Sequence, residues 1–203
     1  DIPVVLPGAV ESFLALDAPV DFCDADAVDG WIASLEPGSI GWELALRTGM
    51  YGVSHYGEGQ SLSRRLYERF LRDLPIQLNL VADVGCGVGG FSHVMASRSA
   101  CDIVGLDASG LALRMAMAAW SGPELSVPEL QLGTQLRARR LAVPTTPRLG
   151  RISWLCADIH NPPLMAEAFD LVVAINLIDS SPSPAIALGQ AAAMVRPGGY
   201  LLL

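Results

Sequence analysis

The sequence predicts an α/β protein built on a doubly wound parallel sheet, and three features carry this prediction. Short apolar runs such as residues 78–84 and 170–175 recur along the chain and stop at glycine or a polar residue, as buried parallel strands do. Stretches of helical length separate them, and a glycine-rich turn at residues 85–90 follows the first run. Because repeated β-α units cross over in a right-handed sense, the strands should form one sheet with helices on both faces.

The composition excludes several classes of protein. The chain has 203 residues and a net charge of −8, whereas proteins that bind nucleic acids or membrane surfaces through charge are usually basic. All thirteen basic residues are arginine, so no lysine can act as a nucleophile. The four cysteines form no C-x-x-C pair, which argues against a zinc site or a disulfide framework. We therefore expect a protein of the reducing cytoplasm without a metal site or a membrane span.

Residues 1–75 should form a helical extension in front of the sheet. Two short helices are expected among its acidic, proline-containing first forty residues, at 10–16 and at 27–35, the second capped by Asp26.

Two further helices are expected in this extension, with a break between them. A helix at residues 42–47 should stop at Gly49, and residues 51–57 should form a loop rich in aromatic and polar groups. Ser61 should cap an amphipathic helix at residues 62–74. The apolar positions of that helix step by four residues: Leu62, Leu66, Phe70 and Leu74.

Residues 76–203 are expected to form the ligand-binding core, and its glycine turn indicates the ligand. Such a turn allows close backbone approach, and the helix after it begins with unpaired N–H groups. Gly85, Gly87 and Gly90 fit the dinucleotide pattern G-x-G-x-x-G. Gly85, Gly87 and Gly89 fit G-x-G-x-G instead, with Asp83 two residues before the first glycine. A carboxylate there suits a ligand that carries an ammonium group and is poorly placed beside a pyrophosphate, although a nicotinamide dinucleotide remains the alternative.

The second β-α unit consists of a strand at 102–106 and a helix at 110–120, after a helix at 91–97. Asp107 ends this strand about 20 residues beyond the glycines, the spacing of an acid that accepts hydrogen bonds from a ribose. Residues 121–150 then interrupt the pattern with four prolines and a cluster of arginines. They predict an insertion, either a lid or anion-binding arm or, by preference, a solvated loop.

Two more strands, at 152–156 and 170–175, precede a helix at 185–195 and a last strand at 200–203. Asp158 and Asn176 follow the ends of the first two. In doubly wound sheets ligands bind beyond the carboxyl ends of the strands. The glycine turn, Asp107, Asp158 and Asn176 should therefore share one crevice.

These pieces together resemble the class I S-adenosylmethionine (SAM)-dependent methyltransferases, which have a Rossmann-like fold. The resemblance covers residues 78–203 except the insertion, in five segments in the family order: 83–90, 104–109, 156–163, 169–179 and 195–203. Within it, residues 174–184 resemble the methyltransferase domains of ovothiol-type biosynthesis, which implies a small-molecule acceptor.

The resemblance implies which residues hold SAM. The turn with Gly85, Cys86, Gly87 and Gly89, together with Asp83, would contact the methionine part. Asp107 would bind the ribose hydroxyls and Asp158 the adenine amino group, with Ala108 and Ile159 beside the adenine. Asn176 would face the methyl group and the substrate.

The chemistry needs few catalytic groups, because methyl transfer depends mainly on positioning the two reactants. A general base helps when the acceptor is N–H or O–H, and the candidates are His55, Tyr56, Asn176 and Asp179. Two alternatives remain: an NAD-dependent oxidoreductase, and a non-catalytic methyltransferase-like subunit indicated by the arginine cluster.

The resemblance also implies two further strands beyond the fifth. Residues 199–203 would otherwise leave an apolar sheet edge unprotected. We expect a C-terminal segment of a longer chain, or another chain in an oligomer, to cover that edge.

Overall fold

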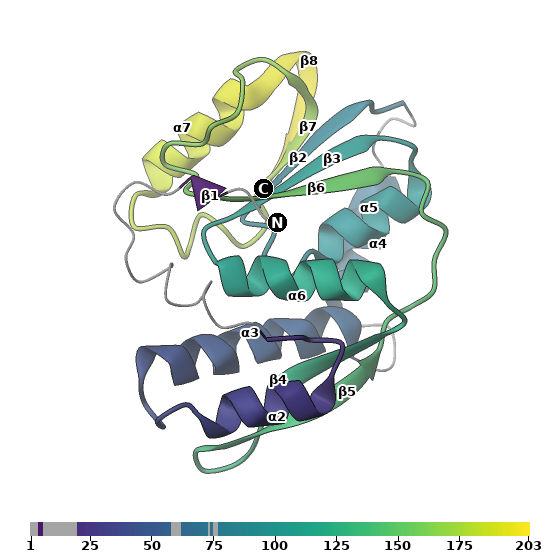
Figure 1. Ribbon diagram of the computed structural model, residues 1–203. Helices are drawn as coiled ribbons and strands as arrows, with labels where there is room; N and C mark the ends of the chain where they lie inside the picture. Colours follow the sequence, from purple (N-terminus) through teal and green to yellow (C-terminus); the bar gives the residue numbers. More distant parts are fainter. Residues whose placement is uncertain (1–3, 6–19, 58–61, 73, 75–76) are drawn as a thin grey trace.

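The computed structural model describes residues 4–5, 20–57, 62–72, 74 and 77–203. Its centre is a six-stranded sheet in the order β1-β6-β3-β2-β7-β8, with every neighbouring pair parallel (Figure 1). The strands are β1 (Val4–Val5), β2 (Leu80–Val84), β3 (Asp102–Asp107), β6 (Arg151–Ala157), β7 (Phe169–Val173) and β8 (Val195–Leu202). The predicted α/β class, with a parallel Rossmann-like sheet, is confirmed.

Helices cover both faces of this sheet. Alternate strand residues point to opposite faces, and apolar side chains on each face pack against helices. Val81 of β2 packs among side chains of α4 (Leu62–Arg72) and α5 (Gly90–Arg98). Its neighbour Ala82 packs on the other face with α7 (Pro184–Met194). Helix α6 (Gly110–Ser121) lies on the α5 face, where Leu113 meets Trp154 and Cys156 of β6.

The N-terminal extension is not purely helical, contrary to the prediction. Strand β1 extends the sheet beyond β6, with Val4 opposite Cys156. The helix expected at 10–16 lies outside the described residues. Helix α2 (Ala25–Ala33) begins two residues earlier than predicted, because Asp24 rather than Asp26 is its N-cap and accepts a hydrogen bond from the Asp26 N–H.

The insertion at 121–150 is wrongly predicted as a solvated loop. It forms an antiparallel hairpin of β4 (Glu124–Leu132) and β5 (Gln135–Ala142). Leu125, Val127 and Leu141 are at most 2% exposed, and they share one core with α2, α6 and α3 (Ile40–Tyr56). We call the hairpin, α2 and α3 together the cap. Figure 1 shows that the cap lies on the far side of α6 from the sheet.

Helix α3 is continuous, where a break was predicted at Gly49 and a loop at 51–57. The helix runs unbroken from Ser39, whose hydroxyl accepts from the Trp42 N–H, to Tyr56. Its glycines serve close packing: a Cβ at Gly49 would lie 1.8 Å from the Pro128 carbonyl oxygen, and one at Gly52 would lie 2.7 Å from Val127. Glycine thus lets the hairpin touch the helix backbone.

Helix α4 packs through a different face from the one predicted. Leu66 is 41% exposed, whereas Tyr67 is buried in a cluster with Leu71. Leu74, the last residue of the predicted stripe, packs in the same cluster but lies beyond the end of the helix. The proposed cap, Ser61, lies outside the described residues.

Strand β8 starts before the predicted residue 200, at Val195, and takes in the Pro197–Gly199 turn with a shift in register. In the described part of the chain β8 pairs only with β7, and its residue Tyr200 is exposed. Among the same residues, no helix is both long enough and apolar enough to cross a bilayer.

The contact between α3 and β4 gives a direct test of this cap. Gly49→Ala should lower the free energy of unfolding by about 3 kcal/mol, because the new methyl group meets backbone that must move. Gly30→Ala is the matched control: Gly30 also lies inside a helix, but nothing is within 4 Å of its Cβ position. That change should stabilise the protein by about 0.5–1 kcal/mol. Urea unfolding measures both, and equal effects would contradict the close contact.

Candidate functional site

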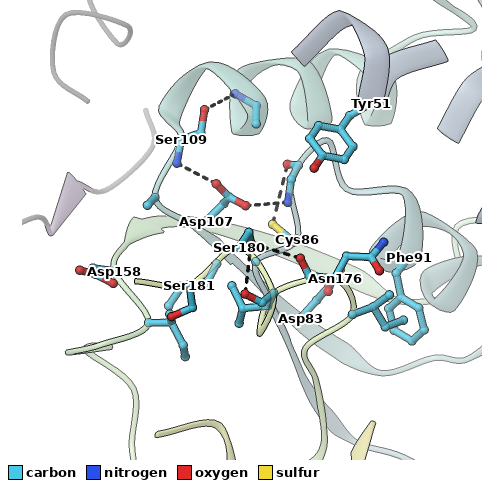
Figure 2. A pocket seen from close by; sticks show the side chains of 18 of the residues that line it. Tyr51, Asp83, Cys86, Phe91, Asp107, Ser109, Asp158, Asn176, Ser180 and Ser181 are labelled. Carbon is cyan, nitrogen blue, oxygen red and sulfur yellow. Dashed lines mark hydrogen bonds between the residues drawn. The ribbon is translucent and has the colours of Figure 1, made fainter. Parts of the chain in front are cut away.

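A cavity of about 470 Å³ opens where β2, β3, β6 and β7 end. Helix α3 forms its opposite wall. Of the ten predicted cofactor residues, every one except Gly89 lines it. These nine are Asp83, Gly85, Cys86, Gly87, Asp107, Ala108, Asp158, Ile159 and Asn176. Figure 2 shows the labelled side chains Asp83, Cys86, Asp107, Asp158 and Asn176 gathered around this space.

The glycine turn has the left-handed backbone that its residues predict. Gly85, Gly87 and Gly89 have φ values of 70°, 53° and 78°, where any other residue would be strained. Gly87 has no atom within 4 Å of a Cβ position and lines the cavity, so its backbone is open to a ligand. Gly89 faces away, because a Cβ there would lie 2.6 Å from the ring of Trp154. It begins α5 and allows packing rather than ligand contact.

Asp107 joins two turns of the cavity floor. Its two carboxylate oxygens accept hydrogen bonds from the Gly87 N–H at 2.8 Å and the Ser109 N–H at 2.7 Å (Figure 2). Burial raises the pKa of this carboxyl, although both hydrogen bonds oppose the rise. Ser109 also caps α6 through its hydroxyl.

Asp83 lies deeper and is only 4% exposed. Burial raises its pKa to about 7, against the hydrogen bond that the Ser92 hydroxyl donates at 2.6 Å. A nearby ligand cation would favour the ionised form. Cys86 beside it is buried, and burial raises the pKa of the thiol well above its usual value, so it is not an activated nucleophile.

Asp158 lies at the rim and makes contacts that the sequence did not reveal. The backbone N–H of His160 donates to its Oδ1 at 2.9 Å, and Nδ1 of the same residue lies 2.6 Å from that oxygen. Burial alone would raise the pKa of Asp158, but these hydrogen bonds outweigh it and lower the pKa. Nε2 of His160 lies 3.0 Å from the Ser181 hydroxyl, and both residues line the cavity.

The wall provided by α3 was missed because the helix was predicted to break. Leu44, Thr48, Tyr51 and His55 line the cavity. They follow one another at intervals of four, three and four residues, the period of one helix face. That signal was present in the sequence, but Gly49 and Gly52 obscured it.

His55 is the one predicted catalytic candidate on this wall. Its Nε2 lies 3.2 Å from the Tyr67 hydroxyl, and burial lowers its pKa to about 4. The ring is therefore neutral near pH 7. Gly90 makes room for it, since a Cβ there would lie 2.2 Å from Nδ1 of His55.

Tyr56 has to be corrected as a catalytic candidate, because it does not line the cavity. Its buried hydroxyl donates to the Val88 carbonyl at 2.7 Å and lies 2.7 Å from Nδ1 of His93. Tyr56 therefore supports the glycine turn through its hydrogen bond to Val88, outside the cavity. Asp179 is exposed and likewise does not line the cavity.

Asn176 lines the cavity just beyond β7 with a φ of 55°, a conformation that asparagine tolerates better than most residues. The Ser180 hydroxyl donates to the carbonyls of Asn176 and Leu177 at 3.3 and 3.1 Å. These bonds hold the turn that presents Asn176.

Comparison with known proteins agrees with this geometry. Residues 82–203, more than half of the chain, match the family model of the methyltransferase domain. The chain belongs to the class I SAM-dependent methyltransferase family. A ubiquinone biosynthesis O-methyltransferase of Alkalilimnicola ehrlichii is 28% identical over 122 residues, which are 60% of this chain and 39% of that protein. This methyltransferase chain thus spans well under half the length of that relative.

Solved structures show the same fold at low sequence identity. The [4+2]-cyclase SpnF aligns with a TM-score of 0.54 and 19% identity, over 98% of this chain and 60% of its own. A complex of the Haloferax volcanii Trm112 methyltransferase activator with a methyltransferase gives a TM-score of 0.52 and 17% identity, over 82% and 60%. The Haemonchus contortus phosphoethanolamine N-methyltransferase 2 gives 0.53 and 13%, over 85% and 34%.

The structural role of Tyr56 can be separated from a catalytic one. Tyr56→Phe should lower the free energy of unfolding by about 1–3 kcal/mol, because it removes a buried hydroxyl that has two partners. The affinity for S-adenosylhomocysteine should change less than about threefold. Tyr51→Phe is the control, since Tyr51 lines the cavity and is 47% exposed; its stability should not change. Urea unfolding and calorimetry test this, and an unaltered stability of Tyr56→Phe would contradict the assignment.

Proposed function

We propose that this methyltransferase chain binds SAM in the 470 Å³ cavity and transfers its methyl group to a nitrogen or oxygen atom of a small molecule. The observation that carries the proposal is the arrangement of three acids around one open glycine turn. Asp83, Asp107 and Asp158 come from the ends of three neighbouring strands, and all line the same space.

The side chains fit the parts of SAM separately. Asp107 is half-buried, and backbone N–H groups direct both of its carboxylate oxygens, which suits acceptance of hydrogen bonds from two ribose hydroxyls. Asp158, with Ala108 and Ile159 beside it, would receive the adenine amino group. Asp83 would face the ammonium group of the methionine part, along the open backbone of Gly87.

When bound, SAM supplies an electrophilic methyl group on a sulfonium. The chain contributes position and exclusion of water: α3 closes the cavity from the side opposite the strand ends, so that two reactants can be held together. Asn176 offers an amide that can orient the acceptor.

His55 offers a neutral imidazole, but its low pKa makes it a weak base. We therefore assign it to orienting an acceptor N–H or O–H more than to removing its proton. The rings of Tyr51, Tyr67 and Phe91 line the same cavity as His55, which suits a small organic substrate.

Cofactor binding can be tested with substitutions at the two ends of β3, Asp107 and Asp102. Isothermal titration calorimetry should show that S-adenosylhomocysteine binds and that NAD does not. Asp107→Asn should weaken binding at least about tenfold, since one acceptor oxygen is lost. Asp102→Asn is the matched control, because Asp102 starts the same strand, is exposed and pairs with Arg151 outside the cavity. Binding of NAD alone, or equal losses in the two variants, would contradict the proposal.

The ionisation of Asp83 predicts a pH dependence. In the ligand-free protein its pKa is raised to about 7, and an ammonium group beside it would lower that value. Acidification below pH 7 should therefore weaken S-adenosylhomocysteine binding, by up to about tenfold per pH unit. Asp83→Asn should bind more weakly at pH 8 and lose most of this dependence. Calorimetry between pH 5.5 and 8.5 checks both; an unchanged slope in the variant would show that another group titrates.

A further inference from the structure

His160 links two walls of the cavity. It follows β6 by three residues, and its ring lies between Asp158, on the same turn, and Ser181, in the loop between β7 and α7. The distances are 2.6 Å from Nδ1 to Asp158 Oδ1 and 3.0 Å from Nε2 to the Ser181 hydroxyl. Its backbone carbonyl accepts from Gln190 of α7 at 3.4 Å.

The direction of the hydrogen bond to Asp158 follows from its partners. The Asp158 carboxylate can only accept, so Nδ1 carries the proton that it donates. Nε2 lies within hydrogen-bond distance of the Ser181 hydroxyl, which can donate to a ring lone pair or accept from a ring N–H. Two donors of His160 thus occupy Oδ1 of Asp158. In the described part of the chain no hydrogen bond falls on Oδ2, so the carboxylate is turned with one oxygen available to a ligand.

The loop at the other end of this chain of bonds contains Asn176. Between Asn176 and Ser181 the turn is closed by the hydroxyl of Ser180, and the Ser183 N–H donates to the Ser181 hydroxyl at 3.3 Å. The ring of His160 ties this locally folded loop to the turn after β6. Figure 2 shows Asp158 and Ser181 close together at one side of the cavity, with Asn176 farther along it.

We propose that His160 is a positioning residue that clamps the loop containing Asn176 to the carboxylate of Asp158, so that a nucleoside held by Asp158 orders the acceptor side of the cavity. The inference rests on the proposed function for the identity of the nucleoside. His160 would touch neither reacting atom. Its effect would pass from Nδ1 to Asp158 in one direction and from Nε2 to Ser181 in the other.

A Ser-His-Asp series also occurs in hydrolases, but this arrangement favours positioning. The Ser181 hydroxyl already accepts from the Ser183 N–H. The residue directly after it, Pro182, has no N–H to donate to an oxyanion, which a serine nucleophile needs.

Two substitutions separate the arms of the clamp. In His160→Asn, the amide nitrogen can occupy the position of Nδ1 and donate to Asp158, but the side chain is too short to reach Ser181. In His160→Gln, the longer amide can reach Ser181 but does not reproduce the donor to Asp158. Ser181→Ala removes the second arm from its other end.

Hydrogen exchange measured by mass spectrometry over residues 177–183 provides the readout. Without ligand, His160→Asn and Ser181→Ala should each speed exchange of this loop, by about threefold or more. The double variant should match the single ones, because both remove the same bond. In the wild-type protein, saturating S-adenosylhomocysteine should slow exchange of the loop by about tenfold.

Measurements with ligand then test whether cofactor binding at Asp158 orders the loop that contains Asn176. His160→Asn should bind S-adenosylhomocysteine within about threefold of wild type and yet lose the added protection of the loop. His160→Gln should bind about tenfold more weakly and keep the slow exchange of the ligand-free loop.

Failure of the clamp and failure of the proposed function give different results. Unchanged exchange in ligand-free His160→Asn and Ser181→Ala, or full ligand-induced protection in His160→Asn, would overturn the clamp. If these variants show the expected ligand-free exchange but the wild-type protein binds no S-adenosylhomocysteine, the proposed function is overturned and, with it, the nucleoside coupling.

Discussion

The carboxylate of Asp107 holds the candidate site together. It receives the N–H groups of Gly87 and Ser109, which belong to the turns after β2 and β3. The same two strands are joined again where Gly85 and Cys86 donate to the Leu106 carbonyl at 2.7 and 3.1 Å. These bonds fix the open glycine turn beside the half-buried Asp107, and the other parts of the cavity are arranged around that pair.

Burial of acids at this site has a cost in stability that depends on pH. Between the ordinary value of 3.8 and its folded value of about 7, Asp83 keeps a proton in the folded protein that the unfolded chain has released. Its contribution to folding stability therefore falls as the pH rises through this window. His55 and His93 act in the opposite sense, because burial lowers their pKa values to about 4 and about 3. Their contributions are lost as the pH falls below about 6.5.

The cap, formed by α2, α3 and the β4–β5 hairpin, adds a second wall to the crevice at the strand ends. Helix α3 packs on the hairpin through Gly49 and Gly52 and faces the strand ends through Thr48, Tyr51 and His55. One helix therefore touches two structures on different sides, and the hairpin sets its position. The hydrogen bonds of His160 act at the opposite rim, where they join the turn after β6 to the loop after β7.

The sequence by itself determined the sheet, the glycine turn and the acids at the strand ends. Apolar strand runs and the φ values that only glycine adopts freely are local properties, and parallel strands bring their carboxyl ends to one edge. The tertiary structure alone decided the hairpin, the continuity of α3, the burial of Tyr56 and the bond between His160 and Ser181. In the sequence Gly49 resembles a helix stop. The structure shows instead that Pro128, distant in the chain, approaches so closely that no side chain fits there. Contacts of this kind join residues whose separation along the chain leaves no periodic signal.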